Sequence, residues 1–186
     1  ADIRLYKSAP DVAVPANPGT TGLVSYFDME SNKVADGLSG TTGTLSSVTF
    51  AASALTSLGQ AAQFNGTSAY VDLGADYWTK VVSKLSSCTM ATWVNYTGSG
   101  NVWQRVVDFG CGQNVNTFLT CNAGTAGIAR FAVKTNVPTA DSAGAGYTET
   151  NVSGARALSI GWHHLAGVVD ATGSPVMSIY VDGVLA

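Results

Sequence analysis

Trp103-Gln104-Arg105-Val106-Val107-Asp108-Phe109-Gly110 is the stretch that decides the fold of this chain. It is short, rich in β-branched and aromatic residues, and closed by a glycine. Two similar segments follow it, at residues 116–120 and 128–134. Short segments of this composition, bounded by turn residues, are typical of consecutive antiparallel strands. The sequence therefore predicts a β-sheet here and no helix.

Strict alternation along these strands predicts which side chains share a face. In the first strand it groups Arg105 with Val107 and places Asp108 on the opposite face. In the third strand it places Phe131 and Arg130 on opposite faces. One face is therefore expected to be core. The other is expected to carry planar and charged groups that suit a sugar or an acidic partner.

The composition indicates an extracellular β protein. The length of 186 residues fits one all-β sandwich domain, and only 11% of the residues are charged. The net charge of −3 provides no basic surface, so nucleic acid is not an expected partner. No apolar run approaches the roughly 18 residues of a membrane span. We expect a secreted or cell-surface protein without a membrane span.

The three central strands and four further segments, all in the same order, carry a resemblance to a known family. The further segments are 22–28, 62–73, 89–94, and the pair 161–166 with 179–183. Together they resemble the laminin-G-like (concanavalin A-like lectin/glucanase) jelly-roll modules that are attached to bacterial polysaccharide-degrading enzymes. The resemblance implies an all-β fold, a concanavalin A-like jelly-roll sandwich of two antiparallel sheets.

The resemblance divides the chain into two parts. Residues 1–21 are expected to form an N-terminal strand and a Pro-rich linker, and residues 22–186 the jelly-roll domain. The family closes its fold with a C-terminal strand like residues 2–6, so this domain is expected to lack its last strands. Residues 2–6 are either the tail of a preceding repeat, in a larger protein with neighbouring domains, or a strand that packs Ile3 and Leu5 into the sandwich.

Two segments are predicted to depart from strand structure. Between residues 76 and 85, apolar residues recur at helical spacing and predict a short helix. Its apolar positions are Trp78, Val81, Val82 and Leu85. Residues 137–157 are polar and Gly-rich, which predicts a long loop or an irregular hairpin.

The resemblance implies a non-catalytic carbohydrate-binding accessory module with a polysaccharide or glycan as its partner. Glycoside hydrolases need a pair of carboxylates beside the scissile bond. This chain has only two glutamates and no predicted strand with two acids two residues apart. The rival function is an adhesion or spacer module that contacts proteins.

Sugar binding uses an aromatic surface and side chains with several hydrogen-bonding groups. The candidate ligand-binding residues are Trp103, Arg105, Arg130 and Lys134. An ordinary solvated strand face is the alternative for these positions. No catalytic residue is predicted.

Calcium is the one cofactor that the sequence suggests. Asp28 and Asp36 lie near the opening strand, where related modules commonly bind calcium at their rim. Carboxylate and backbone carbonyl oxygens are the ligands that this ion prefers. Capping of turns by the same two carboxylates is the alternative.

The chain has three cysteines, an odd number that leaves at least one thiol unpaired. Cys111 and Cys121 stand where the family has other residues, at the ends of two adjacent predicted strands. This joint departure from the family predicts a disulfide across the hairpin, and two free thiols are the alternative. Cys88 is expected to be buried as a small apolar residue.

Overall fold

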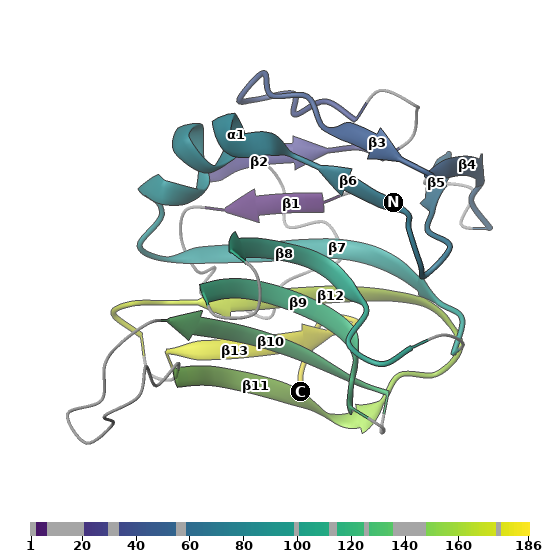
Figure 1. Ribbon diagram of the computed structural model, residues 1–186. Coiled ribbons are helices and arrows are strands. Elements are labelled where there is room, and N and C mark those ends of the chain that lie inside the picture. Colours follow the sequence, from purple (N-terminus) through teal and green to yellow (C-terminus); the bar gives the residue numbers. More distant parts are fainter. Residues whose placement is uncertain are drawn as a thin grey trace, which may run out of the picture.

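The computed structural model of the chain is a sandwich of two antiparallel β-sheets (Figure 1). It describes residues 3–6, 21–29, 34–54, 59–98, 101–111, 115–124, 127–135, 148–173 and 176–186. One sheet has six strands in the order β14-β13-β12-β7-β1-β2, and the other has four in the order β11-β10-β9-β8. The predicted all-β sandwich of two antiparallel sheets is confirmed.

The strands of each sheet come from distant parts of the sequence. The six-stranded sheet contains β1 (Ile3–Tyr6), β2 (Leu23–Phe27), β7 (Cys88–Tyr96), β12 (Gly161–Val169), β13 (Met177–Val181) and β14 (Val184–Leu185). The four-stranded sheet contains β8 (Arg105–Cys111), β9 (Val115–Ala123), β10 (Ile128–Thr135) and β11 (Thr148–Ala157).

The remaining elements lie together beside β2, at one end of the sandwich (Figure 1). They are β3 (Thr44–Ser46) paired with β6 (Tyr70–Asp72), β4 (Thr49–Ala52) paired with β5 (Gln60–Gln63), helix α1 (Gly74–Lys80) and the 3₁₀ turn η2 (Val82–Lys84).

The core lies between the two sheets, where alternate residues of facing strands meet. Its most deeply buried apolar side chains include Leu5, Phe27, Met90, Leu119, Phe131, Leu165 and Ile179. Burying a side chain of this size contributes roughly 1.5–3 kcal/mol relative to exposure. Segments far apart in the sequence therefore hold one another in place.

Strand β1 lies inside the six-stranded sheet, between β2 and β7. Leu5 stands opposite Ser25 on one side and Met90 on the other, and its side chain is 2% exposed. Ile3 packs against the same apolar cluster. The prediction that Ile3 and Leu5 pack into the sandwich is confirmed. The Pro-rich linker falls on residues 7–20, outside the described residues.

The predicted helix is present as α1 and η2, but its anchor is Tyr77. The Tyr77 ring lies 5.5 Å from the ring of Phe27 and 5.7 Å from that of Phe109, measured between centroids. Its hydroxyl donates a hydrogen bond to Ser25 Oγ at 2.8 Å. Burial raises the pKa of Tyr77 to about 12. Trp78, the next residue, is half exposed.

Residues 137–157 were predicted to form a long loop or an irregular hairpin, and the loop alternative is wrong for the second part of this segment, which pairs with β10 in an irregular hairpin. β11 is a ten-residue strand that pairs with β10 from Thr135 to Ile128. It is an edge strand with few apolar residues, because only one of its faces contributes to the core. Val152 is the apolar side chain that packs against the core cluster. Residues 136–147 lie outside the described part of the chain.

The predicted disulfide between Cys111 and Cys121 is wrong. Cys111 stands opposite Val115 at the closed end of the β8–β9 hairpin, whereas Thr120, next to Cys121, stands opposite Arg105 at the other end. Six residues of strand span roughly 20 Å, and a disulfide needs Cα atoms within about 7 Å. Cys121 is a buried free thiol, and burial raises its pKa. Cys88 is free as well, and burial raises its pKa to about 11.

Candidate functional site

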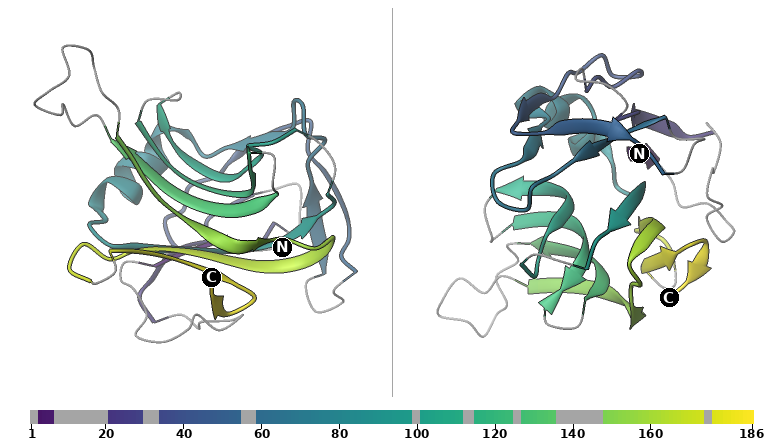
Figure 2. Two further views of the ribbon diagram at one scale, coloured as in Figure 1. Left: turned by 90° about the horizontal axis from the view of Figure 1, so that it is seen from below. Right: turned by 90° about the vertical axis from the view of Figure 1, so that its right-hand side faces the viewer.

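One face of the four-stranded sheet points away from the six-stranded sheet and carries polar side chains. The four strands bend so that this face is concave (Figure 2). The strand register arranges its residues in three rows. The first row is Arg105, Thr120, Arg130 and Ser153; the second is Asp108, Phe118, Ala132 and Asn151; the third is Gly110, Asn116, Lys134 and Glu149. We call these positions the concave face.

One strand irregularity brings Arg105 to this face, and a second sets the register of Arg130. The register of β8 shifts between Arg105 and Val107, so Arg105 shares a face with Asp108 while Val107 is buried in the core. The prediction from strict alternation, which grouped Arg105 with Val107, is therefore wrong. β10 has a similar irregularity just before Arg130. As a result, Thr120 of β9 stands between Arg105 and Arg130 in one row.

Trp103 supplies the aromatic surface beside the first row. Its backbone has φ +67°, and its N–H donates to the carbonyl oxygen of Asn122 at 2.6 Å. The Cζ atoms of Arg105 and Arg130 lie 5.8 Å and 5.3 Å from the indole centroid, within the range of a cation–π contact. The side chain is nevertheless 41% exposed. The two guanidinium groups thus hold an indole that still faces solvent.

Arg105 is fixed by an aromatic ring and a carboxylate. Its Cζ lies 3.5 Å from the centroid of the buried Phe118 ring, and its Nε lies 3.4 Å from Asp108 Oδ2. Burial lowers the pKa of Arg105, while the charges of Asp108 and Glu149 act in the opposite direction. Burial raises the pKa of Asp108, and the charge of Arg105 partly offsets this.

Arg130 has a matching set of partners across β11. Its Nη1 lies 3.4 Å from Glu149 Oε1, and its Nε donates a hydrogen bond to Ser153 Oγ at 3.0 Å. Glu149 Oε1 also accepts a hydrogen bond from Asn151 Nδ2 at 3.1 Å. Each arginine of the concave face therefore has a carboxylate partner on the same face.

The structure brings together three of the four predicted ligand-binding residues: Trp103, Arg105 and Arg130. Lys134 belongs to the third row, opposite Asn116 and Glu149. The polar residues that complete the site were not among the predicted ones; they are Asp108, Glu149, Asn151 and Ser153. Three of these lie on β11, in the segment that was predicted to form a loop or an irregular hairpin. Their alternation with Val152 was the available signal.

Asp36, one of the two predicted calcium ligands, organises the loop after β2. Its carboxylate accepts hydrogen bonds from the N–H groups of Tyr26 at 3.0 Å and Leu38 at 2.9 Å, and from the Ser39 hydroxyl. Burial acts to raise the pKa of Asp36, but these hydrogen bonds outweigh it and hold the pKa below its usual value. This is the turn-capping role that was the alternative to calcium binding.

Calcium binding at Asp28 and Asp36 stays a prediction. Among the residues that the structure describes, no group of three or more His, Cys, Asp or Glu side chains could hold a metal ion. A calcium ion at Asp36 would compete with the hydrogen bonds that the carboxylate already accepts.

A second polar cluster joins the start of β12 to the turn after β13. His163 Nδ1 lies 2.8 Å from Asp182 Oδ2, and Asp182 Oδ1 accepts the N–H of His164 at 2.9 Å. His163 Nε2 lies 3.2 Å from Ser159 Oγ and 3.0 Å from the Ser159 carbonyl oxygen. A carbonyl oxygen can only accept a hydrogen bond, so Nε2 must carry a proton to bond to it. A protonated Nε2 cannot take the proton of the Ser159 hydroxyl group. These contacts give the cluster a structural role, in which it connects β12 to the turn after β13.

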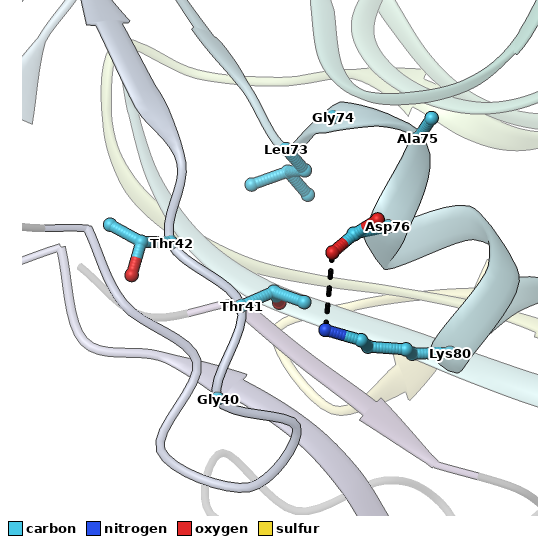
Figure 3. Close-up of a pocket in the computed structure, with 8 residues that line it drawn as sticks. All are labelled: Gly40, Thr41, Thr42, Leu73, Gly74, Ala75, Asp76 and Lys80. Atoms are coloured by element: carbon cyan, nitrogen blue, oxygen red, sulfur yellow. Dashed lines mark hydrogen bonds and ion pairs between the residues drawn. The ribbon is translucent and has the colours of Figure 1, made fainter.

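A shallow pocket of about 330 Å³ lies outside the concave face, between residues 40–42 and the start of α1 (Figure 3). Its charged groups are Asp76 and Lys80, which form an ion pair at 3.2 Å and are both largely exposed. Leu73 is its largest apolar side chain, and no aromatic residue lines it. The pocket lacks the stacking surface that the concave face provides.

Across the described part of the chain, no helix has the length and apolar character needed to cross a membrane. Residues 65–186 match the family model of the concanavalin A-like lectin/glucanases superfamily. This region includes all four strands of the concave face. Comparisons with curated proteins and with solved structures gave no match. The chain belongs to the concanavalin A-like lectin/glucanase superfamily.

Proposed function

We propose that this domain is a non-catalytic carbohydrate-binding module of a secreted polysaccharide-acting or cell-surface protein. The observation that carries the proposal is the exposed Trp103 indole on a concave face, in contact with two arginines that are each paired with a carboxylate. A sugar ring offers a C–H surface that stacks on an aromatic ring and hydroxyl groups that both donate and accept hydrogen bonds. The concave face provides both kinds of partner.

The arrangement is fixed before any ligand arrives. Arg105 and Arg130 contact the indole, and carboxylates hold both guanidinium groups. Ordering flexible side chains on binding costs roughly 0.5–1.5 kcal/mol each. A face whose long side chains are already ordered avoids much of this cost, which supports a binding role for these positions.

The positions of the acidic residues support the non-catalytic part of the proposal. Asp108 lies on β8 and Glu149 on β11, at opposite edges of the four-stranded sheet. Three strand spacings separate their backbones by about 14 Å, and the two residues stand in different rows of the face. Each of these carboxylates is also paired with an arginine.

Protein binding at the same face is the second candidate. Tryptophan and arginine are the residues most enriched at the energetic centres of protein interfaces, and Trp103 with its two arginines has this composition. A neighbouring domain of a larger protein or a separate partner would then cover the face. In that case the domain would serve as an adhesion or spacer module.

Extracellular location is part of the proposal and is supported by the low content of charged residues. The cysteines give it no support, because Cys88 and Cys121 are free thiols. The experiment that tests the function is affinity electrophoresis of the domain in gels that contain plant, microbial or host polysaccharides. Retardation by at least one of them is expected. Retardation by none, together with capture of a protein through the concave face, would support the adhesion role instead.

A further inference from the structure

We propose that the concave face selects uncharged saccharides over those that carry carboxylate or sulfate groups. This inference rests on the proposed carbohydrate-binding function and names the ligand class for the same site. It follows from the way in which the charges of the face are paired.

Among its described residues, the concave face carries three cationic and two acidic side chains. The cationic ones are Arg105, Arg130 and Lys134, and the acidic ones are Asp108 and Glu149. Asp108 lies 3.4 Å from Arg105, and Glu149 lies 3.4 Å from Arg130. Lys134 stands directly opposite Glu149 in the register of β10 and β11. Every cation is therefore next to a carboxylate in space or in register.

Each of the two guanidinium groups already has a carboxylate beside it. Arg105 directs Nε towards Asp108 and lies over the Phe118 ring, while Arg130 uses Nε for Ser153 and Nη1 for Glu149. Bidentate recognition of a carboxylate or sulfate requires two N–H groups on one free edge. The contacts of Arg130 use a nitrogen of each of its edges, whereas Arg105 keeps its Nη1–Nη2 edge. An anionic ligand at either edge would also approach the carboxylate that is already there, and like charges at such distances repel.

The same pairs suit the hydroxyl groups of a neutral sugar. A hydroxyl group donates one hydrogen bond and accepts others, so it can bridge a carboxylate oxygen and a guanidinium N–H. Asn151 and Ser153 add an amide and a hydroxyl group between Arg130 and Glu149. The indole of Trp103 adds a stacking surface that needs no charge on the ligand.

The first experiment measures affinity for three classes of polysaccharide in 50 mM and 500 mM NaCl by isothermal titration calorimetry. The probes are neutral glucans, xylans and mannans, the uronate polymers polygalacturonate and alginate, and dextran sulfate. We expect a neutral polymer to bind at least tenfold more tightly than any acidic one, with less than a twofold change between the two salt concentrations.

Tighter binding of an acidic polymer, weakened strongly by salt, would overturn this inference and leave the proposed function standing. Binding of none of the polymers would overturn the proposed function and this inference with it. Dextran sulfate and the uronate polymers separate sulfate from carboxylate recognition in the first of these outcomes.

A variant pair tests the charge pairing itself. Asp108→Asn frees the guanidinium of Arg105 while keeping the size of the side chain, and Asp76→Asn on α1 makes the same change in net charge outside the face. We expect the ratio of acidic to neutral affinity to rise at least tenfold in Asp108→Asn and to stay unchanged in Asp76→Asn. Equal ratios in the two variants would show that the pairing does not select the ligand. Circular dichroism melting confirms that both variants are folded.

Discussion

The ring of Phe131 fills the space beside Gly167: a Cβ atom at position 167 would lie 2.5 Å from two atoms of that ring. Phe131 belongs to β10 and Gly167 to β12, so the contact joins the two sheets. The missing side chain allows the fully buried phenyl ring to approach the backbone of the opposite sheet. The distance between the sheets at this point is set by a glycine.

The first prediction is that Gly167→Ala destabilises the domain by about 1–3 kcal/mol or more, because overpacking forces the sheets or the ring to move. Urea unfolding measures the change. Gly37→Ala is the matched control, since nothing lies within 4 Å of a Cβ at that exposed position, and its effect should stay within about 0.5 kcal/mol. Equal effects of the two substitutions would contradict the packing argument.

The second prediction concerns Trp103. Trp103→Ala should weaken polysaccharide binding about tenfold or more, because it removes the stacking surface. Trp78→Ala on α1 is the control, since Trp78 is 50% exposed and lies outside the concave face. Affinity electrophoresis compares the two variants with the unchanged domain. Normal binding by Trp103→Ala would place the ligand elsewhere on the molecule.

The third prediction is an alkaline loss of stability that depends on Tyr77. The pKa of Tyr77 is raised by burial from 10.0 to about 12, so the unfolded chain loses its proton first. The contribution is complete below pH 10 and falls as the pH rises towards 12, by on the order of 3 kcal/mol. Tyr77→Phe should be less stable at pH 8 by about 1 kcal/mol, because it loses the hydrogen bond to Ser25. Tyr77→Phe should not show this alkaline loss of stability. Urea unfolding measures the free energy of unfolding of both proteins from pH 8 to 11.5, and a difference between them that does not change with pH would show that Tyr77 is not the titrating group.

The fourth prediction is that a reductant leaves the melting temperature unchanged. Cys88 and Cys121 are free thiols, and burial raises the pKa of both. A buried thiol with a raised pKa reacts slowly, because the thiolate is the reactive species. Iodoacetamide should therefore label these two cysteines only after unfolding, as mass spectrometry would show. A lower melting temperature in dithiothreitol would mean that a disulfide forms after all.

The fifth prediction concerns Asp36. Asp36→Asn should cost about 1.5–3 kcal/mol, because the charged carboxylate accepts hydrogen bonds from two amides and a hydroxyl group. The native pKa of Asp36 lies below its usual 3.8. Its contribution is therefore present above pH 3.8 and is lost as the pH falls through the native value. Thermal melts from pH 7 to 2 should show this loss in the unchanged domain and not in the variant.

The same melting experiment checks calcium. If Asp28 and Asp36 bind the ion, added calcium raises the melting temperature and chelation lowers it by linkage. Identical melting curves in excess calcium and in excess chelator would remove the predicted site. Asp36→Asn distinguishes the two roles. If Asp36 is a calcium ligand, the variant is less stable and its melting temperature no longer responds to calcium; if Asp36 only caps the turn, the variant is less stable and no calcium response is lost.

The sheet architecture could be predicted because its signals are local. Alternation and β-branched residues from Trp103 to Lys134 identify three successive strands. The burial of Leu5 was predicted from the resemblance of residues 2–6 to the closing strand of the family. The site could be predicted only in part. The irregularity before Val107 reverses the face of Arg105, and alternation alone carries no signal for an inserted residue.

The other predictions that the structure corrects depend on features that the local sequence pattern does not contain. β11 is polar because it is an edge strand with one solvated face, so its sequence resembles a loop. The disulfide failed because pairing depends on hairpin register, and Cys111 and Cys121 lie towards opposite ends of the β8–β9 pair. Tyr77 was missed because the sequence does not show on which side of α1 the sandwich lies.

The position of β1 determines how the domain responds to mechanical force. β1 is hydrogen-bonded along both sides, because each of its four residues is paired with one residue of β2 and one of β7. A pulling force transmitted through β1 along its axis loads both sets of hydrogen bonds in shear, so they must break together. A force applied to an edge strand of the same sheet, β14 or β2, loads only the hydrogen bonds to its single neighbouring strand. The domain should resist tension through β1 far better than tension through either edge strand.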